Sequence, residues 1–249
     1  MVNGGLVMVA AALVFGACGD DGGNQPALDA APIPVDAEVL TPCTSTGGAG
    51  GTHKLFLNFE SQELTPGEND ATLNRSSIVT ETVTSPPFFD GVATRDDIIT
   101  LVVDNVTTIL APFDIEVVTT RPAAGPYTMI VLGGTPDDLG LAPGSFVVAS
   151  NTCLPNVENH IHLLTDVSYG AAISFIIGAY GLGSGFGASK TNGACLCWNH
   201  VDCEPRLNGA CTLSADEEVE IDPALNCDGS SVTTMNQHQK FKQGFGCRP

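Results

Sequence analysis

The residues best suited to chemistry in this sequence are a carboxylate and two imidazoles at alternating positions, Glu158, His160 and His162. On a β-strand, side chains two positions apart point to the same face of the sheet, so these three groups could face one point. Imidazole nitrogens and carboxylate oxygens are both ligands that zinc accepts. The spacing therefore makes the three residues candidates for a metal site that could support hydrolysis.

The same alternation has a simpler interpretation. Glu158, His160 and His162 would then form the solvent-facing side of a strand whose other side, with Ile161 and Leu163, is buried. A His-x-His pair without a clear third ligand is a weak zinc signature. We therefore expect no cofactor and keep zinc as the alternative.

The cysteines indicate an exported protein. Cys18 follows an apolar run from Leu6 to Phe15 and the small residues Gly16 and Ala17, which resembles a bacterial lipoprotein signal. We expect residues 1–17 to be removed as a signal peptide and Cys18 to carry the lipid. The remaining cysteines are even in number, which favours disulfides formed in an oxidising compartment; they are Cys43, Cys153, Cys195, Cys197, Cys203, Cys211, Cys227 and Cys247.

The charge of the chain excludes one class of partner. Nine Lys and Arg residues stand against 28 Asp and Glu residues, and the formal net charge is −19. Such a surface repels nucleic acid phosphates and anionic lipid headgroups. We therefore expect no nucleic acid partner, and contact with a membrane only through the lipid anchor.

The elements that must position these residues begin near residue 53. Residues 18–52 are rich in Gly, Pro, Ala and Asp and predict a flexible tether. Apolar residues at helical spacing predict a helix over 95–110, which Pro112 ends. Alternating or β-branched apolar runs predict strands at 54–60, 115–120, 128–132, 146–149 and 161–164.

The uncharged segment 169–189 has two interpretations, a membrane span or a helix buried in the protein. Six glycines between Gly170 and Gly187 make a poor span, which favours a buried helix over about 171–182. The order of elements predicts an α/β (α+β) sandwich with a mixed sheet over residues 53–189. Residues 190–249 hold six cysteines and many turn residues, which predicts a disulfide-rich loop subdomain.

Four stretches of the chain resemble a group of secreted, metzincin-like metallopeptidases of bacterial envelopes. They are Lys54 to Glu60, Ala111 to Pro122, Tyr127 to Pro136 and Phe245 to Pro249. The resemblance covers most of the chain from Lys54 to Leu182. It implies a metzincin-like mixed sheet with two main helices.

In that family a central helix carries the motif His-Glu-x-x-His-x-x-Gly-x-x-His, whose histidines bind zinc and whose Glu takes a proton from zinc-bound water. When the glycine of the motif is aligned with Gly181, the first His, the Glu, the second His and the third His fall on Ser174, Phe175, Gly178 and Ser184. None of these side chains can replace an imidazole at zinc or act as the base. The resemblance therefore implies a metallopeptidase fold without the family's catalytic residues.

Together these patterns predict a non-catalytic, pseudo-metallopeptidase lipoprotein of the bacterial cell envelope, with a binding or structural role. Gly19 after Cys18 favours sorting to the outer membrane, by resemblance to lipoproteins that lack Asp there; secretion is the alternative. We expect a monomer whose partner is a peptide or a protein. The competing hypothesis is a metal-dependent hydrolase or peptidase that uses His160 and His162.

Overall fold

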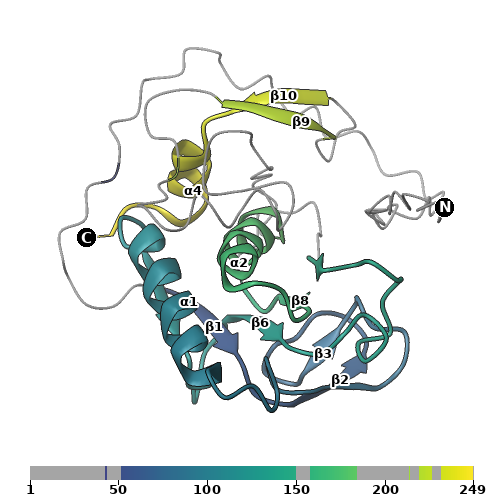
Figure 1. Cartoon of the computed structure of the whole chain (residues 1–249). Helices are drawn as coiled ribbons and strands as arrows, with labels where there is room; N and C mark the ends of the chain where they lie inside the picture. Colours follow the sequence, from purple (N-terminus) through teal and green to yellow (C-terminus); the bar gives the residue numbers. More distant parts are fainter. Residues whose placement is uncertain are drawn as a thin grey trace, which may run out of the picture.

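The structure is a computed structural model with a mixed α/β fold, and it describes residues 43, 52–149, 158–183, 213, 219–225 and 231–248 (Figure 1). Its elements are β1 (His53–Asn58), β2 (Gln62–Pro66), β3 (Arg75–Ser76), β4 (Val83–Ser85), α1 (Arg95–Leu110), β5 (Ile115–Val118), β6 (Thr128–Leu132), β7 (Val147–Val148), β8 (Ile161–Leu164), α2 (Tyr169–Gly183), β9 (Val219–Leu225), β10 (Ser231–Met235) and α4 (Gln237–Phe245).

The main sheet has five strands in the order β5-β1-β6-β8-β7. The first four strands are parallel, and β7 runs antiparallel to β8 at one edge. Every residue of β6 is buried, as expected for a central parallel strand that is covered on both faces. The predicted mixed α/β sheet is confirmed, and all five predicted strands belong to it.

The sheet is covered differently on its two faces. On one face, alternate residues of the strands pack against α1 and α2, as Leu57, Ile130 and Leu164 do. On the other face, Phe56 and Val131 pack in a second apolar cluster with Leu64 of β2. In Figure 1 α1 lies to the left of β1, α2 lies above β6, and β2 and β3 lie at the lower right. The core therefore has two apolar layers, one on each face of the sheet.

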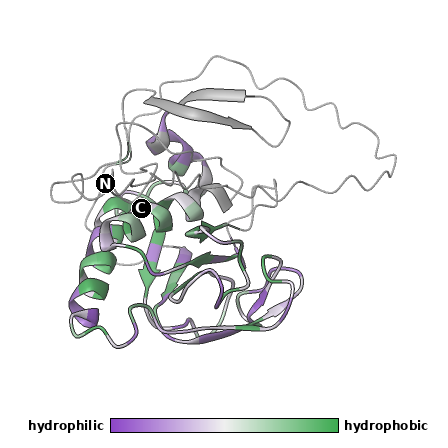
Figure 2. Cartoon of the chain, turned by 45° about the vertical axis from the view of Figure 1, so that its right-hand side comes forward, coloured by the Kyte–Doolittle hydropathy of each residue, from purple (hydrophilic) through white to green (hydrophobic). Residues whose placement is uncertain are grey.

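Helix α1 has the bounds that the apolar spacing predicts. Val102, Val106 and Ile109 form its buried face. The acidic pair Asp96 and Asp97 lies in its first turn, where a negative charge interacts favourably with the helix dipole. Figure 2 shows apolar and polar residues on different sides of this helix. The helix therefore follows from amphipathic patterning.

Helix α2 is apolar around its whole circumference and lies in the core. Ala171, Ile173, Ile176 and Ile177 are fully buried between α1, the sheet and α4. The prediction of a buried helix in this segment is confirmed. None of the described helices combines the length and the apolar character that crossing a membrane would need.

Several described elements were not predicted. The short strands β2, β3 and β4 form a three-stranded sheet, and β9 and β10 form an antiparallel pair. Segment 190–249 was predicted to be rich in loops, but it contains β9, β10 and α4. Pro223 and three acidic residues in or next to β9 conceal its strand pattern, and α4 has only two large apolar residues, Phe241 and Phe245.

The C-terminal segment is docked on the main domain. Phe241 and Phe245 of α4 belong to the same core cluster as the sheet and α2. A disulfide joins Cys43 to Cys247, and the Cys43 N–H donates to Nε2 of His238 at 2.8 Å. Cys43 lies inside the range predicted to be a tether, yet it is only 7% exposed. The other seven cysteines lie outside the described residues.

Gly133, which follows β6, allows the chain to pass very close to the segment around Pro86. Its φ is +135°, and a Cβ there would lie 2.3 Å from the Pro86 oxygen and 2.8 Å from the Phe88 nitrogen. We expect Gly133→Ala to destabilise the protein by about 2–4 kcal/mol, because backbone atoms must move to admit the methyl group. Urea unfolding measures the loss.

Gly91 is the matched control for this substitution. Its φ is +72°, but no atom lies within 4 Å of a Cβ built there. Gly91→Ala therefore meets only the penalty for a left-handed backbone, about 1 kcal/mol. Equal losses for the two variants would contradict the close-approach explanation.

Candidate functional site

The histidine pair predicted as a metal site lies inside the protein. His160 immediately precedes β8 and His162 is within it, and they are 2% and 0% exposed. The interpretation of this face as a solvent face is wrong. Strand β8 lies between β6 and β7, and α2 packs against it on the side of Leu164. Since side chains alternate along a strand, His160 and His162 share that helix-covered side.

The two imidazoles lie parallel. Their ring centroids are 6.0 Å apart and their planes differ by 6°. Two such ligands alone do not complete a zinc site, because protein zinc sites use at least three side chains. No group of three or more His, Cys, Asp or Glu side chains suited to a metal occurs among the described residues.

The third predicted ligand, Glu158, lies at the amino end of the same strand and is exposed. Burial raises the pKa of the Tyr180 hydroxyl, and the Glu158 carboxylate raises it further. Because Glu158 is exposed, its carboxylate does not lie in the buried layer between helix and sheet that holds the two imidazoles.

Burial keeps His162 in its neutral form. The pKa of its imidazole is lowered to about 3, first by burial and then by His160. In the unfolded chain the pKa is about 6.5, so the unfolded state binds a proton that the folded state does not bind. Stability due to His162 is therefore lost as the pH falls from about 6.5 toward 3.

We expect His162→Gln to reduce this acid sensitivity. Between pH 7 and pH 5 the parent should lose on the order of 2 kcal/mol more free energy of unfolding than the variant. Urea titrations at the two pH values measure the difference, with His53→Gln as the control at a half-buried histidine of β1. Parallel pH profiles for parent and His162→Gln would show that His162 is not held neutral.

The positions aligned with the zinc motif also lie inside the protein. Ser174 and Phe175 on α2 are 2% and 6% exposed, and Gly178 is half-buried. Phe175 is part of the core cluster formed with α1 and the sheet. Ser184, aligned with the third histidine, lies outside the described residues, and so does the lipidation candidate Cys18.

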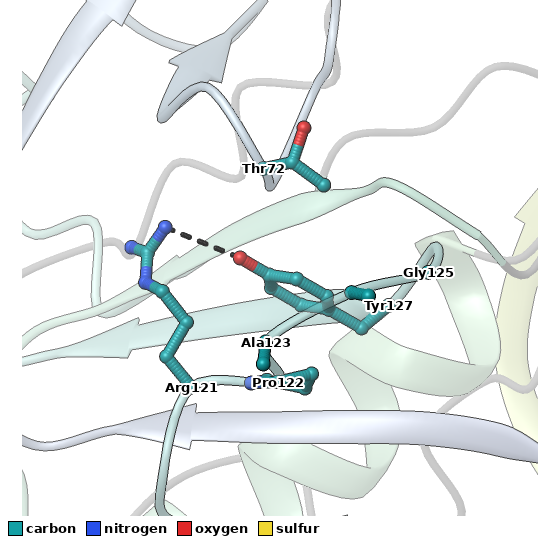
Figure 3. A pocket seen from close by; sticks show the side chains of 7 residues that line it. Thr72, Arg121, Pro122, Ala123, Gly125 and Tyr127 are labelled. Carbon is teal, nitrogen blue, oxygen red and sulfur yellow. Dashed lines mark hydrogen bonds between the residues drawn. The ribbon is translucent and has the colours of Figure 1, made fainter.

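A cavity of about 430 Å³ opens on the opposite side of the sheet from α2. It lies between the turn around Thr72 and the loop that joins β5 to β6 (Figure 3). Its walls are formed by one cation, one phenol, one hydroxyl and four small or cyclic residues; they are Thr72, Arg121, Pro122, Ala123, Ala124, Gly125 and Tyr127.

Arg121 is held in place by neutral acceptors. Its Nη1 donates to the Ala71 carbonyl and the Tyr127 hydroxyl, at 3.3 and 3.1 Å. Its Nη2 donates to the side-chain oxygens of Gln62 and Asn74, at 2.7 and 2.6 Å. The guanidinium thus joins the β2 layer to the β5–β6 loop.

Tyr127 gives the cavity a neutral polar group. Its hydroxyl donates to the Ala71 carbonyl at 3.0 Å and accepts from Arg121, as Figure 3 shows for the latter contact. Burial raises the pKa of this hydroxyl, although the Arg121 guanidinium opposes the shift. The phenol is therefore protonated at neutral pH and adds no negative charge that would neutralise Arg121.

Neither a protein-family model, nor a curated protein, nor a solved structure is significantly similar to this chain.

The sequence did not single out Arg121 and Tyr127 as functional residues. They lie six positions apart in a Pro- and Gly-containing loop, and their partners Gln62, Ala71 and Asn74 come from a segment about 50 residues earlier. One signal was available. Arg121 is one of only nine basic residues in a strongly acidic chain, and it lies shortly after β5 and directly before Pro122.

Proposed function

We propose that this protein is a non-catalytic, pseudo-metallopeptidase-like protein of the bacterial cell envelope that acts by binding a partner. The observation that carries the proposal is the burial of α2, the helix aligned with the family's zinc helix. At the aligned positions Ser174 and Phe175 point into a packed interior. Side chains with no basic nitrogen and no carboxylate cannot hold zinc or activate water.

The burial of His160 and His162 also favours a binding role over catalysis. The two imidazoles are 2% and 0% exposed on the helix-covered side of β8, so water and a substrate have no access to an ion held by them. The competing hypothesis, a hydrolase that uses His160, His162 and Glu158, requires these side chains to move toward one another and toward water.

Metal analysis of the full mature chain, purified without chelator, tests the proposal, and casein digestion is run on the same sample. We expect no stoichiometric zinc and no cleavage that a chelator inhibits. One tightly bound zinc per chain together with chelator-sensitive cleavage would overturn the proposal. Loss of that zinc in His160→Gln and His162→Gln would then assign it to the histidine pair.

The proposed location has its own test. If Cys18 carries the lipid, the mature chain should partition into detergent and its N-terminal peptide should show the mass of an acylated cysteine. Cys18→Ser should release the protein into the soluble periplasmic fraction. An unmodified Cys18 in a protein that remains in the membrane fraction would contradict a lipid anchor at this residue.

A further inference from the structure

We propose that the cavity between Thr72 and the β5–β6 loop binds a carboxylate that is attached to an apolar body. Arg121 would hold the carboxylate, and the loop would hold the apolar part. The inference rests on the proposed binding role and deepens it by naming the chemistry of the ligand.

The charge of Arg121 supports an anionic ligand. Among the described residues, no carboxylate lies within ion-pair distance of its guanidinium, and its four oxygen acceptors are all neutral. The nearby Asp70 carboxylate accepts from Thr72 at 2.6 Å and lies 3.7 Å from Arg75. A half-buried guanidinium without a counter-ion attracts anions strongly, because the surrounding protein screens its charge less than water does.

The donors of Arg121 indicate which anion fits. A guanidinium has five N–H groups, and the four on Nη1 and Nη2 already have acceptors. The Nε–H has none among the described residues. One remaining donor beside an uncompensated positive charge suits a monoanionic carboxylate, whereas a phosphate group requires several donors.

The remaining walls suit an apolar ligand body. The side chains of Pro122, Ala123 and Ala124, which line the cavity, carry no polar atom. Leu73, next to Thr72 in the turn, is 59% exposed, more than any other large apolar residue described. The cavity volume is in the range of about 300–1,000 Å³ that small-molecule sites occupy. A carboxylate on a short apolar group, such as the C-terminus of a peptide or a free small acid, combines both features.

Binding measurements on the full mature chain test the inference, with N-acetyl-leucine, its uncharged amide and inorganic phosphate as probes. We expect millimolar or tighter binding of the acid by ligand-observed NMR, and at least about tenfold weaker binding of the amide, which lacks the charge. A short peptide that ends in leucine with a free carboxylate distinguishes the two sources of ligand. Tighter binding of this peptide than of N-acetyl-leucine assigns the site to peptide C-termini, and equal binding assigns it to small acids.

Two variants separate ligand binding from folding. Arg121→Lys keeps the charge but loses the planar donor group, and we expect it to weaken acid binding about tenfold. Ala124→Trp fills the cavity from an exposed position, so it should abolish binding at an unchanged melting temperature. Lys54→Gln, which removes a positive charge from an exposed ion pair with Glu116 and does not line the cavity, is the matched control and should bind like the parent.

Several outcomes would overturn the inference. They are equal binding of acid and amide, preferential binding of phosphate, undiminished binding by Ala124→Trp, and no binding of any probe. None of these outcomes changes the zinc and casein results, so failure at this cavity can be distinguished from failure of the proposed non-catalytic role.

Discussion

Replacing Cys43 and Cys247 together with alanine is expected to lower the free energy of unfolding by about 2–5 kcal/mol. The disulfide joins residues that are 204 positions apart. A cross-link that closes so long a loop removes much conformational entropy from the unfolded chain, and its loss restores that entropy. The effect should therefore be among the largest of any substitution in the described part of the chain.

The contacts around the disulfide show where the structure should open first. The Asp114 N–H donates to the Gly246 carbonyl at 3.2 Å, and the Arg248 N–H donates to the Pro112 carbonyl at 2.9 Å. The Arg248 side chain also donates to carbonyls of Phe113 and Ile115. These bonds attach the C-terminal segment to the start of the edge strand β5, and together with the packing of α4 they remain when the disulfide is removed.

Urea unfolding measures the global loss, and hydrogen exchange of residues 236–248 measures the local opening. We expect the double variant to unfold at lower urea concentration and to exchange its amide hydrogens faster. The faster exchange should be confined to the C-terminal segment and the start of β5. Thiol reductant added to the double variant is the control, because it reports disulfides formed by cysteines elsewhere in the chain. Unchanged stability and unchanged exchange would show that these hydrogen bonds and the packing of Phe241 and Phe245 hold the segment without the disulfide.

Phe175→Glu is expected to destabilise the protein by about 4 kcal/mol or more, although the family motif has Glu at this position. Phe175 is buried in the core with residues of α1 and of the sheet. The substitution removes an aromatic ring from a close-packed interior and places a carboxyl group there. Removal of a core phenylalanine alone costs about 3–5 kcal/mol, and an unpaired buried polar group adds to this.

Thermal and urea unfolding measure this effect, and Phe175→Leu is the matched control. Leucine keeps an apolar side chain at the position, so the control should lose only about 1.5 kcal/mol. Suppose instead that Phe175→Glu had the melting temperature of the parent and bound zinc. Then α2 would be accessible to water and would differ from a catalytic helix only by the loss of its zinc ligands. That result would also remove the main support for the proposed function.

Most of the main sheet and both of its covering helices could be predicted from local patterns. The apolar spacing of α1 gave its observed bounds, and the β-branched run of β6 gave the bounds of that strand. Such patterns are informative because these elements bury a continuous face or a whole strand. β3 and β4 escaped prediction because two and three residues leave no periodicity to read, and β2 escaped it because Leu64 is its only buried residue.

The candidate sites, in contrast, could be predicted from the sequence only in small part. The alternation of His160 and His162 correctly placed them on one side of a strand, but it could not show that α2 covers that side. Arg121 and Tyr127 gave no pattern at all, because their partners come from Gln62 and the turn around Asn74. A binding site made by contacts between distant segments has no signature in the local sequence.

By itself, the sequence determined the elements of the α/β sandwich, the buried character of α2 and the absence of zinc-binding side chains at Ser174, Phe175 and Gly178. These properties depend on residue type and on spacing along one segment. Only the tertiary structure decided that the histidine pair is buried, that Cys43 pairs with Cys247 and that Arg121, which pairs with no carboxylate among the described residues, lines a cavity. Burial, disulfide pairing and the local field of a charge all depend on which distant segments pack together.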